Sequence, residues 1–266
     1  MKKIFLSADI EGTCGIAHWD ETSKGHADYP HFANQMSREV AAACEGALAA
    51  GAEEILVRDS HDSARNINPA MLPESACIFR GWSQHPYSMM SGIDDTFDGV
   101  IFTGYHSAAS WEGNPLSHTM NTRNNHVKIN GVVASELMMN SLTAAMNNVP
   151  IMMVTGDKML CEWFHSVCPG TLTVPVSEGT GNGSISMHPD KAVRLIRENA
   201  EKIAQLDRDA CMFPLPERFV IEVNWRQHYS ARRASFYPGC TQVDSKTARF
   251  ECDNWMDALC FFAFCL

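Results

Sequence analysis

The first apolar segment of the chain reads Ile4-Phe5-Leu6-Ser7-Ala8, and three similar segments follow: Glu54-Ile55-Leu56-Val57, Gly99-Val100-Ile101-Phe102 and Val149-Pro150-Ile151-Met152-Met153-Val154. Continuous apolar runs are typical of strands buried on both faces, as in a parallel sheet. Helices are expected between and after them, over residues 36–50, 135–147, from about 157, and over 189–206. Strand–helix alternation predicts an α/β fold whose mainly parallel sheet is flanked by helices.

The rest of the chain has a different pattern. Asn130-Gly131 separates two apolar segments within residues 126–133, which is a strong signal for a β-hairpin. Pro214-Leu215-Pro216 indicates a linker. Two strands and a helix are expected after it, over residues 219–223, 247–251 and 253–266. We therefore predict an α/β core over residues 1–212 and a small α+β C-terminal subdomain over 213–266.

Composition limits the class of protein. The chain has 266 residues, of which 45% are hydrophobic and 20% charged, so it is neither disordered nor a collagen nor a coiled coil. No apolar run approaches the roughly 18 residues that span a membrane. The N-terminal apolar stretch Ile4-Phe5-Leu6 is too short for a secretory signal. We expect a cytoplasmic protein without a membrane partner.

Charge and cysteine spacing exclude further classes. The formal net charge is −10, from 31 acidic and 21 basic residues, and this balance argues against a nucleic-acid partner. The ten cysteines form no C-x-x-C pair, which argues against a zinc ribbon or a thioredoxin-type site. They are interpreted as reduced thiols that act as small core residues.

Polar residues follow each apolar segment directly. Asp9 and Glu11 follow the first segment, Asp59 and His61 the second, His106 the third and Asp157 the fourth. In open parallel sheets, ligands bind outside the carboxyl ends of the strands. These side chains are therefore expected at one edge of the sheet.

A metal site is one interpretation of this edge. Asp9 and Glu11 are two residues apart, so in an extended chain both leave the same face, where they repel each other unless a cation lies between them. The alternative for the pair alone is two solvated acids in a loop before Gly12. With His61 and His106 at neighbouring strand ends, the metal hypothesis is favoured. Oxygen and imidazole donors without thiolate suit Zn²⁺, Mn²⁺ or Co²⁺.

Three further features are open to an ordinary interpretation. Glu136 lies in the first turn of a predicted helix and, taken alone, is a helix-dipole partner. His118, taken alone, is a hydrogen-bonded loop histidine. The segment Gly179-Thr180-Gly181-Asn182-Gly183 lacks the ending of a phosphate-binding loop and is expected to be a flexible loop near the site.

The motifs as a set resemble the M55 family of metallopeptidases. They are Ser7-Ala8-Asp9-Ile10-Glu11-Gly12, Asp59-Ser60-His61, Gly104-Tyr105-His106, Ser117-His118-Thr119-Met120 and Ala134-Ser135-Glu136-Leu137. The resemblance runs in order from residue 1 to about 210. It implies two zinc ions held by Asp9, Glu11, His61, His106 and Glu136, with Asp9 as the bridge. It also implies that His118 is needed for catalysis, and that the chain forms a homo-oligomer, a ring-like decamer.

The function that follows is a metal-dependent aminopeptidase. It would hydrolyse short peptides with a free, small N-terminal residue, D-alanine by resemblance to the family's type member, using a metal-activated water. His118 would steady the oxyanion or carry the proton to the leaving amine, and Asp59 would orient His61 or a neighbouring ligand. The alternatives are another dinuclear hydrolase, such as an amidase or a phosphoesterase, and a metal- or peptide-binding protein without turnover. Phosphoesters need cationic clamps, and only Arg58 and Arg123 lie near the motifs.

Two segments bear on substrate and assembly. The loop Trp111-Glu112-Gly113-Asn114-Pro115 departs from the family pattern and is a candidate wall of the substrate pocket. The apolar run Phe261-Phe262-Ala263-Phe264-Cys265-Leu266 is either a buried contact between subunits or an ordinary core helix.

Overall fold

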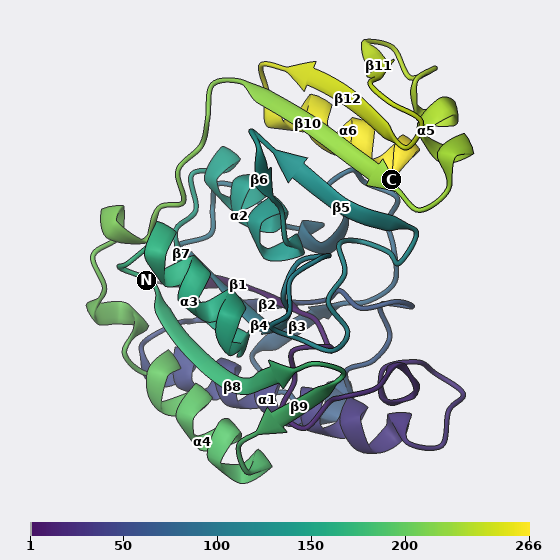
Figure 1. Ribbon diagram of the computed structural model, residues 1–266. Helices are drawn as coiled ribbons and strands as arrows, with labels where there is room; N and C mark the ends of the chain where they lie inside the picture. Colours follow the sequence, from purple (N-terminus) through teal and green to yellow (C-terminus); the bar gives the residue numbers. More distant parts are fainter. Residues whose placement is uncertain (1) are drawn as a thin grey trace.

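The computed structural model describes residues 2–266, which form two β-sheets packed with helices (Figure 1). The larger sheet has the strand order β3-β2-β1-β4-β7-β8-β9. Its strands are β1 (Lys3–Ala8), β2 (Glu54–Asp59), β3 (Ala76–Phe79), β4 (Gly99–Tyr105), β7 (Ile151–Asp157), β8 (Leu172–Thr180) and β9 (Gly183–Ser186). All neighbouring pairs are parallel except β8 and β9, which are antiparallel. The predicted mainly parallel sheet is therefore confirmed.

Helices cover both faces of this sheet. One face packs against α1 (Tyr29–Ala49) and α4 (Pro189–Ala200), and the other faces α2 (Glu136–Met146) and α3 (Lys158–Val167). Strand β1 shows why its sequence is continuously apolar. Ile4 and Leu6 join the core under α1 and α4, whereas Phe5 joins the core on the opposite side.

The second sheet lies at the top of Figure 1 and has the order β11-β12-β10-β5-β6. Its strands are β5 (Asn124–Ile129), β6 (Val132–Val133), β10 (Phe219–Trp225), β11 (Cys240–Gln242) and β12 (Thr247–Cys252). The predicted hairpin is β5–β6, and its turn residues Asn130 and Gly131 both have positive φ, 50° and 82°, as a type I′ turn requires. Because β5 pairs with β10, strands from both sides of residue 212 share this sheet. The domain division at 212/213 stays a prediction.

The C-terminal helices belong to this second layer. They are α5 (His228–Ala234) and α6 (Trp255–Cys265). Phe261, Phe262 and Cys265 are buried, whereas Phe264 is 75% exposed. The apolar run is thus mainly an ordinary core helix within one subunit. No helix of residues 2–266 is long and apolar enough to cross a membrane.

Three segments differ from the prediction in extent or type. Helix α1 begins at Tyr29 rather than near residue 36, with Pro30 in its first turn. Helix α4 ends at Ala200, and a separate 3-10 turn follows. The segment 179–183 is a β8–β9 hairpin turn rather than a flexible loop. The 3-10 turns are η1 (Trp19–Glu21), η2 (Pro69–Met71), η3 (Ser88–Met90), η4 (Ile203–Gln205) and η5 (Asp209–Cys211).

The sheet order positions the functional edge. Strand β1 lies between β2 and β4. After β1 the chain forms α1 on one face of the sheet, whereas after β4 it forms β5 and β6 and then α2 on the other face. In open α/β sheets, the crevice at such a reversal point is where ligands bind. Asp9 follows β1 and His106 follows β4, so both lie at this point.

Candidate metal centre

Six predicted site residues lie together at the carboxyl edge of the larger sheet. Asp9 and Glu11 follow β1, His61 follows β2, and His106 follows β4. His118 lies in the loop between β4 and β5, and Glu136 is the first residue of α2. All of them are buried except His118, whose side chain is 14% exposed.

Asp9 is at the centre of the cluster. Its Oδ1 lies 3.3 Å from His61 Nδ1, and its Oδ2 lies 3.5 Å from His106 Nε2. Glu11 Oε2 is 3.2 Å from the same His61 nitrogen, and Glu136 Oε1 is 3.7 Å from the same His106 nitrogen. Two groups with the spacing of metal ligands therefore share Asp9, one with Glu11 and His61, the other with His106 and Glu136.

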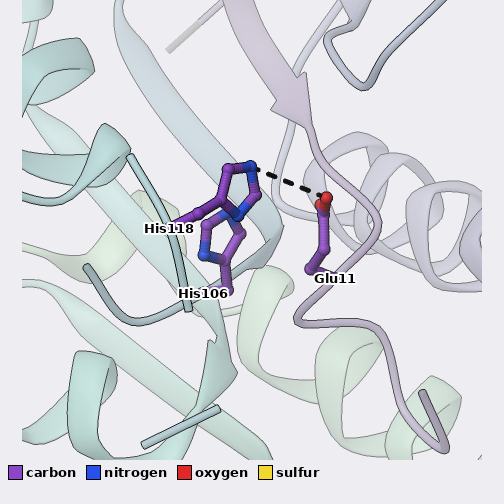
Figure 2. A group of neighbouring side chains, drawn as sticks. All are labelled: Glu11, His106 and His118. Carbon is purple, nitrogen blue, oxygen red and sulfur yellow. Dashed lines mark ion pairs between the residues drawn. The ribbon is translucent and has the colours of Figure 1, made fainter. Parts of the chain in front are cut away.

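His118 lies beside both groups. Its Nε2 is 3.4 Å from Glu136 Oε1 and 3.9 Å from Glu11 Oε1, the pair marked by the dashed line in Figure 2. Its ring stacks on that of His106, with centroids 4.4 Å apart and planes within 7°. Glu11, His106 and His118 form a third group with ligand spacing. The geometry thus allows His118 to contact either a ligand or a reacting group.

Backbone carbonyls fix the orientation of the three imidazoles. The ring N–H groups donate from His61 Nε2 to Thr22 O, from His106 Nδ1 to Ser107 O and from His118 Nδ1 to Leu116 O, each at 2.9 Å. Because the nitrogen facing the carbonyl carries the proton, the other nitrogen of each neutral ring directs its lone pair at the carboxylates. This is the arrangement of metal-ligating histidines, whose second nitrogen is held by a carbonyl or a carboxylate.

Close backbone packing holds the carboxylates in place. Gly12 donates its N–H to Gly104 O at 2.9 Å, and a Cβ on Gly12 would lie only 1.9 Å from Tyr105 O. No larger residue fits this position, so the chain carrying Glu11 lies directly against the end of β4. Glu136 accepts a hydrogen bond from Met120 N at 2.7 Å.

Asp157 and Asp59 support the site from behind. Asp157 accepts hydrogen bonds from Ser107 N at 2.5 Å and Ser107 Oγ at 2.7 Å, so it holds the residue whose carbonyl orients His106. Asp59 accepts two hydrogen bonds from Asn66, whose amide in turn donates to His61 O at 2.7 Å. Asp59 therefore supports the His61 segment through Asn66.

The buried carboxylates of the cluster carry negative charge that must be balanced by positive charge. Burial raises the pKa of Asp9, but the close imidazoles of His106 and His61 outweigh it and hold that pKa well below its usual range. Burial lowers the pKa of His106, yet the nearby carboxylates of Asp9 and Glu136 raise it to about 10. Burial raises the pKa of Glu136. Since three carboxylates converge here, protons or another cation must balance them.

The donor set fits a divalent metal. Asp9 Oδ2, Glu11 Oε2 and His106 Nε2 are buried and, among the residues described, have no hydrogen-bond partner. Groups of this kind are normally satisfied in proteins, so unpartnered atoms that converge indicate a missing ligand. Carboxylate and imidazole donors without thiolate suit Zn²⁺, Mn²⁺ and Co²⁺.

A cavity of about 700 Å³ lies beside this cluster and is called the substrate cavity below. Its lining includes Asp9, Glu11 and Glu136 and the two tryptophans Trp19 and Trp82. Across the described part of the chain, no lysine or arginine lines it. The cationic clamps that a phosphoester needs are therefore missing from its walls.

Comparison with known proteins agrees with this geometry. The family model Peptidase M55, described as D-aminopeptidase, matches residues 1–264. The chain belongs to the M55 peptidase family. A D-aminopeptidase of Bacillus subtilis (strain 168) is 29% identical over 259 residues, which are 96% of this chain and 93% of that relative.

A solved structure of an M55 relative is similar throughout. It is the Zn-dependent D-aminopeptidase DppA from Bacillus subtilis, described as a self-compartmentalizing protease. Its TM-score is 0.90 at 28% identity, and the match covers 98% of this chain and 95% of that one. The family predicted from the motifs and the α/β fold predicted from the strand–helix alternation are both confirmed.

The expectation that loop 111–115 forms a wall of the substrate pocket is wrong within one subunit of this M55 chain. The loop 111–115 does not line the substrate cavity. Trp111 packs edge-to-face on Trp163, at a centroid distance of 5.6 Å. Asn114 donates to Glu11 O at 3.0 Å, so the loop supports a site residue from outside.

Sequence reasoning missed the residues that complete the site. They are Trp19, Thr22, Asn66, Trp82, Ser107 and Leu116. Three of them act through a main-chain carbonyl, which any residue type supplies, so the sequence carries no signal for them. The two tryptophans lie in loops without a periodic pattern. Only their rarity and aromatic character could have indicated a pocket wall.

Proposed function

We propose that this protein is a zinc-dependent aminopeptidase that hydrolyses short peptides with a free, small N-terminal residue of D configuration. The observation that supports it is the pair of carboxylate–imidazole groups that share Asp9 beside the substrate cavity. Family membership and the names of the two relatives support the reaction class.

The proposed metal ligands are Asp9, Glu11, His61, His106 and Glu136, with Asp9 between two ions. Its two oxygens face different histidines, which suits a bridging carboxylate. Divalent ions in such a site supply Lewis acidity and lower the pKa of water to near neutrality. The carbonyls of Thr22 and Ser107 hold the two ligand imidazoles in the required tautomer.

His118 is the proposed acid–base group. Its Nε2 faces Glu136 and Glu11 at the edge of the cluster, while its Nδ1–H is held by Leu116 O. It can therefore hold a proton at Nε2 and deliver it to the leaving amine. Trp19 packs edge-on against the His118 ring, at a centroid distance of 5.2 Å, and limits its rotation.

A free amine suits the rest of the cavity. An N-terminal amine can pair with the site carboxylates, whereas an acetylated one cannot and adds bulk. We also propose that the chain assembles into a ring-like homo-oligomer, a decamer, because the similar DppA is described as self-compartmentalizing. A cytoplasmic location is proposed because all ten cysteines are free, and the cytoplasm keeps thiols reduced.

The test uses purified protein reloaded with Zn²⁺, Mn²⁺ or Co²⁺. Metal content is measured by elemental analysis, and hydrolysis is followed for the amides of D-alanine, L-alanine and glycine, each free and N-acetylated. We expect two metal equivalents per chain and turnover of the free D-alanyl compound. Equal turnover of free and acetylated compounds would instead assign a general amidase. Bound metal without any turnover would assign a binding protein.

A further inference from the structure

A second cavity of about 300 Å³ adjoins the substrate cavity and is called the apolar pocket below. The two share Trp82, Ser88, Met120 and Asn121 as lining residues, so they lie side by side. The far walls of the apolar pocket come from other elements. Their apolar residues are Met139 of α2 and Leu259, Phe262 and Ala263 of α6, and polar residues, among them His85, Arg123 and Asn140, also line the pocket.

Two chain segments connect residues of the proposed active site to residues that line the apolar pocket. After His118 the chain passes directly to Met120 and Asn121, which line both cavities. After Glu136, helix α2 carries Met139 to the pocket, one turn away. If His118 protonates the leaving amine as proposed, the part of a peptide beyond the scissile bond would lie on this side.

The wall between the two cavities is held firmly. Trp82 donates its Nε1–H to Asp62 O at 2.7 Å, and its ring lies 4.5 Å from the guanidinium of Arg58. Arg58 also donates to Gly81 O at 2.6 Å, next to Trp82. These contacts fix the aromatic face before any ligand binds, and a preorganised face loses little entropy on binding.

From this geometry we infer that the apolar pocket receives the side chain of the second residue of the peptide, directly after the scissile bond, and selects a bulky apolar residue there. The inference rests on the proposed function and adds a substrate preference to it. Glycine at this position would leave the pocket empty. Leucine or phenylalanine would fill the pocket and contact Met139, Leu259 and Phe262, which are themselves already buried.

The experiment compares alanyl-glycine, alanyl-leucine and alanyl-phenylalanine, with alanine in the configuration that the enzyme accepts and the second residue as both enantiomers. Values of kcat/KM are measured for the parent enzyme, Ala263→Leu and Ala263→Trp. Ala263 is exposed and lines the pocket, so larger side chains there fill the pocket without altering the core. The matched control is Phe264→Trp, at an exposed neighbour outside the pocket.

The parent should prefer the better leucyl or phenylalanyl peptide to the glycyl peptide by roughly tenfold or more, the scale of apolar pocket discrimination. That ratio should fall in Ala263→Leu and approach one in Ala263→Trp, but stay at the parent value in Phe264→Trp. No preference in an active parent, or a ratio that Ala263→Trp leaves unchanged, would refute the pocket assignment alone. A metal-loaded parent that hydrolyses none of the three peptides would refute the proposed function itself.

Discussion

Glu39 of α1 is a buried carboxylate whose replacement gives a quantitative test of the structure. Its Oε1 accepts hydrogen bonds from Cys14 N at 3.0 Å and Gln35 Nε2 at 2.9 Å, while its Oε2 is buried without a partner. Burial raises the pKa of Glu39 to about 7, although those hydrogen bonds and the charge of Arg38 lower it. Burial raises the pKa of the Cys14 thiol to about 12, so this neighbouring group is neutral at ordinary pH.

The sign of the pH effect follows from the raised pKa. The folded state binds the Glu39 proton more tightly than the unfolded chain, so this stabilisation is fully present below about pH 4.5 and is lost as the pH rises through 7. The difference between 4.5 and about 7 corresponds to about 3 kcal/mol, since one pKa unit is about 1.4 kcal/mol. Glu39→Gln stays neutral at every pH, and its Oε1 can keep both hydrogen bonds. Relative to the parent, the variant should therefore gain about 3 kcal/mol between pH 4.5 and 8.

The assay is equilibrium urea unfolding of both proteins at pH 4.5, 6, 7 and 8, at equal protein and metal concentrations. The other titrating groups are common to both proteins and cancel in the difference between their unfolding free energies. Glu45→Gln is the matched control, because Glu45 is exposed on the same helix and pairs with Arg197 at 3.0 Å. It should change the unfolding free energy by less than about 1 kcal/mol at each pH. Parallel stability curves for the parent and Glu39→Gln would show that the Glu39 carboxyl is not desolvated as the structure has it.

Three predictions concern the proposed site and assembly. His118→Ala should lower kcat by about 10²-fold or more with two metal equivalents retained; metal loss on elemental analysis would make His118 a ligand. Asp9→Ala should lose both metals and activity while its circular dichroism spectrum is unchanged, because Asp9 faces both ligand groups; one metal retained tightly would show that Asp9 is not a bridge. Light scattering at micromolar protein should give a mass well above that of a dimer, and a monomer mass would exclude the ring.

The sequence predicts the larger sheet well because its strands are apolar on both faces. Ile4, Phe5 and Leu6 enter cores on opposite sides of the sheet, so no alternation is needed, and the polar residues after each strand mark its end. Asp9, His61 and His106 meet for the same reason, since parallel strands end at one edge. Glu136 and His118, by contrast, are placed through the family motifs, because nothing local distinguishes them from a helix-dipole partner and a loop histidine.

The second sheet was harder to predict, since its pairing is long-range. The Asn130-Gly131 turn predicts the hairpin, but no local pattern says that β5 pairs with β10, whose partner residues are some ninety positions away along the chain. Val127 opposite Val223 and Ile129 opposite Ile221 fit this register. Many other apolar pairs in the chain would fit equally well, so only the folded chain selects among them.

The preference of the site for a cation depends on the course of three loops as much as on its carboxylates. Three backbone carbonyls, Thr22 O, Ser107 O and Leu116 O, each accept the hydrogen bond from the single N–H of a neutral imidazole. The other nitrogen of each ring then directs its lone pair toward Asp9, Glu11 and Glu136. Without those carbonyls the rings could turn N–H groups toward the acids and satisfy them with hydrogen bonds. With them, the neutral rings cannot do so, and the buried oxygens need either protons on the histidines or an ion. Side-chain chemistry therefore supplies the ligands, and the backbone determines that they act as ligands for a metal.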